Sequence, residues 1–279
     1  MATSTAARAD KPLVLMIGVN DIYCRKTACD CIQDVAKRSY DGTLAALAKD
    51  HNIKLEFTYF MEVMDLEKAI KANKFDGVLC KPWTALRLGR EAGAEFKRVA
   101  DIRDPDDKPN MTGVFVVPAK SPIRSLAGLQ GKRLVFGQPD SFEKYHAPLR
   151  MLAAQNIKPA SGLYFSSCGE NLDALMSGKV DAAVISSYAM TASCAVDFAK
   201  PEDFRTIAKT PEMPLTSVLV DLRKVSAADA ARLQQALLVL AGDKTPADLT
   251  GKGFVAPVSW RPEPVADEAV PPAAKAAAL

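Results

Sequence analysis

The chain has 279 residues, 48% of them hydrophobic and 25% charged, a composition typical of a globular protein with one large or two medium domains. Lys and Arg total 36 against 33 for Asp and Glu, and no basic block occurs, so we do not expect a nucleic-acid partner. The apolar runs fall far short of the roughly 20 residues of a membrane helix, so we expect no membrane span.

In the first half of the chain, strands and helices are predicted to alternate. Apolar runs predict strands over 13–19 and 55–60, and helical spacing predicts a helix over 32–49. A helix over 64–72, a buried strand over 75–80 and a helix over 82–89 are predicted next. This alternation favours an α/β fold with mainly parallel sheets flanked by helices.

A second α/β cycle begins near Lys120, after a strand predicted over 114–117. The later predicted elements are strand 133–136, helix 145–155, strand 163–165, helix 169–177, strand 181–185, strand 215–221 and helix 227–240. We therefore predict two lobes, joined by two hinge strands near 114–117 and 216–220. The predicted boundaries are 12–115 with 216–265 for lobe 1 and 116–215 for lobe 2, with flexible tails at 1–11 and 266–279.

Several segments resemble one family. The run Leu126–Ser141 (LAGLQGKRLVFGQPDS) is similar to the start of the second lobe in periplasmic phosphonate-, phosphite- and phosphate-binding proteins of ABC transporters. Leu172–Val184, with its Gly-Lys-Val-Asp turn, and Gly253–Ser259 resemble a later helix and the closing segment of that family. Phe75–Trp83 resembles its first-lobe site strand.

The resemblance implies a type II, two-lobed periplasmic-binding-protein fold that closes on a small ligand. Such a protein would present the ligand to a permease or a sensor kinase, as a monomer with no cofactor and no covalent chemistry. The small residues of the first ten positions look like the remnant around an export cleavage site, so we expect a periplasmic protein whose signal peptide is not part of this sequence.

In that family the ligand lies at loops that follow the carboxyl ends of strands, where helix N-termini favour anions. Any one of these residues could instead be a helix cap or a packing residue. The candidate ligand-binding residues in the corresponding loops are Asn20, Asp21, Tyr23, Cys24, Cys80, Trp83, Thr84, Ser141, Phe142, Glu143, Cys168, Ser187 and Tyr188.

Two departures from the family bear on the ligand. Where the family carries Ser-Thr-Ser-Gly, this chain has Ser141-Phe-Glu143-Lys, so one hydroxyl remains and a carboxylate is added. Where the family often has a ligand-contacting His, this chain has Cys168, a weak and soft donor. We therefore expect that plain phosphonate or phosphate is not the ligand.

Six cysteines allow two interpretations. In the first, Cys24 pairs with Cys29 or Cys31 in a local disulfide, and Cys194 is a buried small residue. In the second, Cys24, Cys80 and Cys168 converge to bind a soft metal or a thiophilic oxyanion such as arsenite, as in related periplasmic sensors. No zinc or haem spacing is present in the sequence.

An enzymatic function has little support. No nucleophile elbow, phosphate-binding loop or metalloprotease motif occurs. A Cys168/His146 dyad in the second lobe is the remaining enzymatic alternative.

Overall fold

The computed structural model of the chain describes residues 11–28, 32, 35–165, 167–260, 262 and 274–275. The chain divides into two units, and each is described by itself. Unit 1, called lobe 1 below, comprises Met1–Pro109 and Pro214–Trp260, and lobe 2 comprises Asn110–Met213 and Arg261–Leu279. No described helix is long and apolar enough to cross a bilayer.

Lobe 1 is built on a six-stranded sheet in the order β13-β4-β12-β3-β1-β2. Strand β1 pairs in parallel with β2 and β3, while β12 runs antiparallel to β3 and β4. The elements are β1 (Leu13–Val19), α1 (Asp41–His51), β2 (Ile53–Tyr59), α2 (Val63–Lys71), β3 (Gly77–Cys80), α3 (Pro82–Ala92), β4 (Phe96–Ile102), β12 (Thr216–Asp221), α7 (Ala227–Val239), a 3-10 turn (Gly242–Lys244) and β13 (Phe254–Val255).

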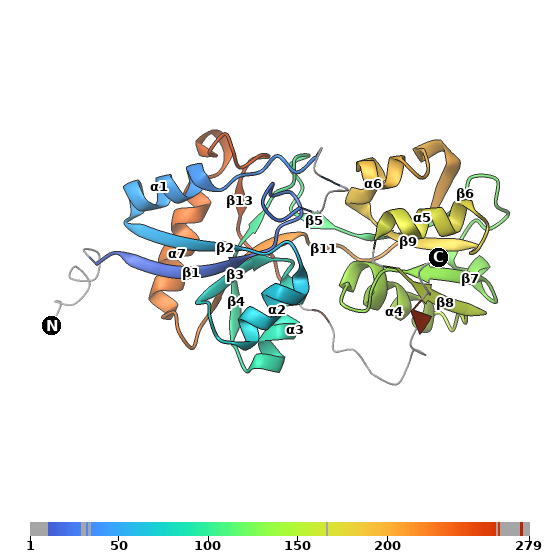
Figure 1. Cartoon of the computed structure of the whole chain (residues 1–279), viewed down its shortest axis with the longest axis horizontal. Helices are drawn as coiled ribbons and strands as arrows, with labels where there is room; N and C mark the ends of the chain where they lie inside the picture. The colour runs from blue at the N-terminus through green and yellow to red at the C-terminus, as the bar shows by residue number, and fades with distance from the viewer. Residues whose placement is uncertain are drawn as a thin grey trace. The chain divides into compact units, whose positions relative to one another are not determined.

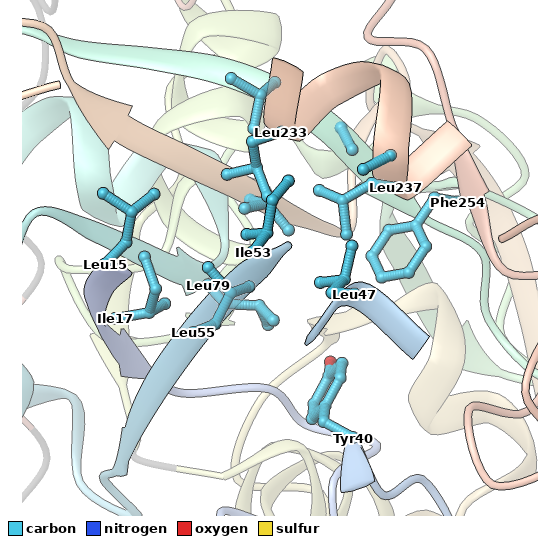
Figure 2. Packing of buried hydrophobic residues seen from close by; sticks show 14 of the residues in the cluster. Leu15, Ile17, Tyr40, Leu47, Ile53, Leu55, Leu79, Leu233, Leu237 and Phe254 are labelled. Carbon is cyan, nitrogen blue, oxygen red and sulfur yellow. The ribbon is translucent and has the colours of Figure 1, made fainter. Parts of the chain in front are cut away.

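Helices cover both faces of this sheet (Figure 1). On one face, Leu47 of α1 and Leu233 and Leu237 of α7 pack with sheet residues such as Ile17 and Ile53 (Figure 2). On the other face, α2 and α3 pack over β3 and β12 in a second cluster. The strands between them alternate side chains toward the two layers, which explains why β3 is buried along its whole length.

Lobe 2 has a sheet in the order β10-β6-β9-β7-β8-β14. One face packs against α5 and the other against α4. The elements are β6 (Gly113–Pro118), a 3-10 turn (Leu126–Leu129), β7 (Arg133–Phe136), a π-helix (Phe142–His146), α4 (Ala147–Ala154), β8 (Ser161–Tyr164), α5 (Cys168–Met176), β9 (Ala182–Ser186), a 3-10 turn (Ser187–Thr191), α6 (Ser193–Val196), a 3-10 turn (Pro201–Asp203), β10 (Phe204–Lys209) and β14 (Ala274–Lys275).

The two sheets share one topology. Apart from the short strands β13 and β14, the order β2-β1-β3-β12-β4 in lobe 1 matches β8-β7-β9-β6-β10 in lobe 2. In both sheets the fourth strand of that order is antiparallel to the third. Strand β1 therefore corresponds to β7 and β3 to β9, so the loops that follow these strands occupy equivalent positions in the two lobes.

The predicted two-lobed α/β architecture with helix-flanked sheets is confirmed, but both sheets are mixed, since β12 runs antiparallel to β3 and β4 and β6 runs antiparallel to β9 and β10. Most predicted elements lie within a few residues of the observed ones. Among the strands of four or more residues, β4 and β10 were not predicted, because Lys or Arg residues within them interrupt the apolar pattern. The helix predicted over 32–49 is wrong in its first part, since α1 begins at Asp41. The segment before α1 instead forms a bridge between Cys24 and Arg38.

The chain passes between the two units a few residues before each strand that was predicted as a hinge. Strand β6 lies entirely in lobe 2 and β12 entirely in lobe 1. The chain passes between the units at 109–110 and 213–214, where β5 (Asn110–Met111) and β11 (Met213–Pro214) form a two-stranded sheet. The predicted lobe boundaries, after residues 115 and 215, lie a few residues later. Of the tail predicted over 266–279, the described part is β14, which pairs with β8.

Candidate functional site

The sequence-predicted site residues lie at the carboxyl ends of strands in their own lobes. In lobe 1, Asn20 follows β1 and Trp83 lies just beyond β3, and these neighbouring strand ends are joined by a hydrogen bond from Asn20 N to Leu79 O (2.9 Å). In lobe 2, Ser141 lies beyond β7, Cys168 beyond β8 and Ser187 beyond β9. Each lobe therefore gathers its candidate residues at one edge of its sheet.

Asp21 is the centre of a buried polar network in lobe 1. Its Oδ2 accepts from Arg38 Nη1 (2.9 Å) and from the Tyr40 hydroxyl (2.8 Å), and its Oδ1 accepts from Thr216 Oγ1 (3.1 Å). The side chains of Asp21 and Arg38 are fully buried. A buried carboxylate that holds a guanidinium and two hydroxyls is satisfied within the protein, so this network fixes the loop after β1.

Arg38 joins three distant parts of lobe 1. Besides Asp21, its guanidinium donates to the carbonyls of Leu249 and Arg103, and its backbone pairs with Tyr23 and Arg25. Burial alone would lower the pKa of Arg38, but Asp21 and Tyr40 raise it, so the guanidinium stays charged. Burial, reinforced by Asp21, raises the pKa of Tyr40 well above its usual value, so its hydroxyl stays a donor.

The other candidates in the loop after β1 are buried or hydrogen-bonded within lobe 1. The Asn20 amide donates to the carbonyls of Phe60 and Met61, which ties the ends of β1 and β2 together. Tyr23 and Cys24 are buried, and burial raises the pKa of the Cys24 thiol. Asn20 and Cys24 therefore have structural roles in this loop.

The loop after β3 differs, because it opens directly into α3. Lys81 is the N-cap residue, Pro82 begins the helix, and the first turn carries no acidic residue and no capping side chain. Trp83 and Thr84 follow in that turn, both buried. A helix start with an adjacent lysine favours negative charge.

In lobe 2, the loop after β7 leads into the π-helix Phe142–His146. Ser141 caps it by accepting from Lys144 N (3.3 Å), and the His146 ring bonds to Pro139 O (2.6 Å). Glu143 is 1% exposed, and its Oε1 accepts from the Ser186 hydroxyl (2.9 Å) at the end of β9. π-Turns inside helices are frequent at functional sites, and this one delivers a buried carboxylate to the strand ends.

The start of α5 is closed by its own side chains. Ser167 accepts from Glu170 N (3.1 Å), and Glu170 Oε2 accepts from Ser167 N (2.9 Å), which forms a capping box. Cys168, the first residue of the helix, is buried and its sulfur accepts from Ser186 N (3.5 Å). Ser187 Oγ accepts from Thr112 N (3.1 Å), and Tyr188 packs against the adjacent apolar cluster.

The cysteine predictions need one correction. Cys24 is a free buried thiol, so the predicted disulfide from Cys24 is wrong. Its predicted partners, Cys29 and Cys31, lie outside the described residues, and the side chain of Cys194 is likewise not described. Within the described part of either lobe, no three His, Cys, Asp or Glu side chains gather as a metal site requires, and the three-thiol site stays a prediction.

Sequence reasoning missed Arg38, Tyr40 and Ser186, which hold the two candidate carboxylates. Arg38 and Tyr40 fall within the helix predicted over 32–49. The pair Asp41-Gly42 was the available signal, because an acidic residue followed by Gly suits a helix start better than a helix interior. Ser186 lies directly before the predicted candidates Ser187 and Tyr188, but its bond to Glu143 was not predicted, since the two residues are 43 positions apart.

Comparisons with known proteins identify one family and one fold. Residues 32–258 match the family described as the periplasmic substrate-binding protein of phosphonate ABC transporters. XAC2383 from Xanthomonas citri bound to ATP is similar, at 18% identity and a TM-score of 0.66, covering 88% of this chain and 91% of that one. No curated protein matches the chain.

Two further solved structures are similar to this chain. PhnD1 from Prochlorococcus marinus, solved with methylphosphonate, is 17% identical with a TM-score of 0.61, covering 89% of this chain and 94% of that one. A histidine kinase sensor domain with similarity to periplasmic binding proteins is 16% identical with a TM-score of 0.51, covering 83% and 91%. At these identities the structures establish a shared fold.

Proposed function

This chain belongs to the family of periplasmic substrate-binding proteins of phosphonate ABC transporters, and from that premise we propose that it captures a small solute and delivers it to a membrane permease. Membership confirms the resemblance carried by Leu126–Ser141 and the type II, two-lobed fold predicted from it. Proteins of this family and fold bind solutes, and we propose that this chain likewise performs no covalent chemistry and acts in the periplasm as a monomer.

The observation that supports a binding role is the placement of the candidate residues. Each lobe presents polar and aromatic side chains at the edge where the parallel strands of its mixed sheet end, the edge at which α/β folds bind ligands. In this proposal, residues at these edges contact the ligand. Lobe 1 contributes Trp83 and Thr84 with Lys81 at the start of α3, and lobe 2 contributes Phe142, Glu143 and Tyr188.

The proposed ligand is not a simple phosphonate or phosphate dianion. Both helices that begin beyond β7 and β8 carry an acidic residue in the first turn, Glu143 and Glu170, and both starts are capped by a serine of the chain. A carboxylate at a helix start takes the position that the helix dipole would otherwise offer to an anion. Lobe 2 therefore opposes a doubly charged oxyanion where the family offers hydroxyls.

Trp83 provides a direct test of lobe 1. The chain has two tryptophans, Trp83 at the start of α3 and Trp260, which lies beside Arg98 in the same lobe. Native mass spectrometry of protein purified without denaturation should show a co-purified small molecule. That molecule should change the tryptophan fluorescence of the Trp260→Phe variant, which keeps Trp83. It should leave the fluorescence of the Trp83→Phe variant unchanged.

The opposite fluorescence pattern would place the ligand away from α3. A protein that shows no bound mass, and no thermal shift with any member of a small-solute panel, would remove the binding role itself. Delivery to a permease is distinguished from signalling through a sensor kinase by reconstituting the protein with the purified permease, since a transport partner should hydrolyse ATP faster when the loaded binding protein is added.

A further inference from the structure

The end of strand β9 holds the two loops that follow β7 and β8. The Ser186 hydroxyl donates to Glu143 Oε1 (2.9 Å) in the π-helix after β7, and the Ser186 amide donates to the Cys168 sulfur (3.5 Å) at the start of α5. Ser186 itself is fully buried. Because both bonds come from one residue, a shift of either loop strains a bond to the end of β9.

The same strand end is bonded to a segment in which the chain passes between the units. There are two such segments, residues 109–112 and 210–215, called the crossing segments below. In the first, Thr112 O accepts from Ser187 N (2.9 Å), and Thr112 N donates to Ser187 Oγ (3.1 Å). Two reciprocal hydrogen bonds fix both the distance and the orientation of Thr112 relative to the end of β9.

Thr210 bonds the second crossing segment to the same place. Its amide donates to Gly113 O (2.9 Å), and its hydroxyl accepts from Gly113 N (2.8 Å). Gly113 is closely enclosed, since an added Cβ atom would overlap the carbonyl oxygen of Glu143 and lie 3.0 Å from Thr210 Cγ2. The loop after β7 and both crossing segments therefore meet at residues 112–113.

The crossing segments leave few backbone torsions free. They contain Pro109, Pro211 and Pro214, and a proline fixes its own φ and favours an extended conformation in the residue before it. The segments are also joined to each other by a hydrogen bond from Leu215 N to Pro109 O (2.9 Å). Stiff, hydrogen-bonded segments pass a displacement of residues 112–113 along the chain rather than absorb it.

We propose that Ser186 and Ser187 are positioning residues that couple the strand-end loops of lobe 2 to the crossing segments. A change in the loop contacts then changes the crossing segments, and the reverse, because an energetic coupling between two sites acts in both directions. The inference rests on the proposed function, since it takes the strand-end loops as solute-binding loops. It deepens that function by assigning residues through which a solute on lobe 2 acts on the segments that join the units.

The first test perturbs a crossing segment and measures a loop. Thr210→Val stays close to threonine in shape but removes the acceptor for Gly113 N. It should raise the rate at which iodoacetamide alkylates Cys168 by about fivefold or more, the lower end of typical coupling between two sites. The reason is that a buried thiol reacts when its loop opens. Thr210→Ser, which keeps the hydroxyl, should stay close to the wild-type rate. Peptide mass spectrometry separates Cys168 from Cys80, the buried thiol of lobe 1, whose rate should not change.

The second test perturbs a loop contact and measures a crossing segment. Ser186→Ala removes the hydroxyl that donates to Glu143. It should raise the hydrogen-exchange rate of the Leu215 amide, which joins the two crossing segments, by about the same factor. Ser177→Ala is the matched control, since it removes a serine hydroxyl at the far end of α5 in the same lobe and should change neither rate.

Ser187 lies between the two ends of the coupling. Ser187→Ala removes the acceptor for Thr112 N and should raise both rates, whereas Ser187→Thr should restore them. An unchanged alkylation rate in the Thr210→Val protein, or an unchanged exchange rate in the Ser186→Ala protein, would overturn the inference. An equal rise in the alkylation of Cys80 would do so as well, because it indicates global unfolding. These outcomes leave the solute-binding role intact, since that role fails only with no bound mass and no thermal shift.

Discussion

Asp21 and Glu143 are buried carboxylates at equivalent points of the two lobes, since each follows the strand that lies second from the same end of the shared strand order. Asp21 is held by a guanidinium and two hydroxyls that come from within lobe 1. Glu143 is held by the hydroxyl of Ser186. The same topological position thus carries an ion pair in lobe 1 and a carboxylate that accepts from a serine hydroxyl in lobe 2.

The two carboxylates connect different parts of their lobes. The charge of Asp21 is balanced by Arg38, and that pair connects the loop after β1 to the carbonyls of Arg103 and Leu249. Glu143 accepts from the Ser186 hydroxyl, which joins the loop after β7 to the end of β9. We infer that Asp21 fixes the strand-end loop of lobe 1 and that Glu143 ties the corresponding loop of lobe 2 to β9.

The largest expected effect comes from breaking the lobe-1 pair. Asp21→Asn leaves the fully buried Arg38 guanidinium without its carboxylate, and removing one partner of such a pair costs about 3–5 kcal/mol. Glu143→Gln is the matched change in lobe 2 and keeps an oxygen that accepts from Ser186, so it should cost about 1 kcal/mol or less. Urea unfolding of the two variants measures the difference, and equal losses would contradict the distinction between the lobes.

A smaller effect is expected from Gly113→Ala. The added methyl group would overlap the carbonyl oxygen of Glu143, and overpacking of this kind costs about 1–3 kcal/mol. Because the π-helix must shift, affinity for the co-purified solute should fall as well. Gly128→Ala is the control, since its new methyl group lies 3.1 Å from Ile123 Cγ2 and overlaps no backbone atom. A Gly113→Ala protein with unchanged stability and affinity would show that the π-helix is not fixed by β6.

The sequence was sufficient to predict the fold class and the strand-end loops. Apolar runs such as Leu13–Val19 and Arg133–Phe136 coincide with β1 and β7, because a buried parallel strand has little freedom in composition. Strands that carry charge were not predicted: β4 contains Arg98 and Asp101, which neutralise each other within the lobe. Local pattern does not reveal such compensation.

The sequence predicted where the candidate residues lie in the fold, but not which residues they contact. The loops that contain Asp21 and Glu143 were identified correctly as strand-end loops, but the residues that decide their roles lie far along the chain. Thr216 is 195 residues from Asp21, and Ser186 is 43 residues from Glu143. Whether a carboxylate is neutralised depends on these long-range contacts, and only the folded lobes bring them together.

The last prediction concerns Cys80, which ends β3 as Ser186 ends β9, so the two lobes place a thiol and a hydroxyl at equivalent points. Burial raises the pKa of the Cys80 thiol from 9.0 to about 12, so the folded protein keeps it neutral. The resulting contribution to stability is complete below pH 9 and is lost as the pH rises through about 12, because the unfolded chain ionises first. Cys80→Ser introduces the residue type that lobe 2 has at the equivalent point. The free energy of unfolding should therefore fall less between pH 8 and pH 10.5 in this variant than in the wild type. The slope attributable to one thiol is at most about 1.4 kcal/mol per pH unit.

The folded thiol should also resist alkylation at pH 8 until denaturant is added, since the thiolate is the reactive form. Identical pH slopes in the two proteins, or rapid labelling of Cys80 in the folded state, would show that this strand end is open in lobe 1.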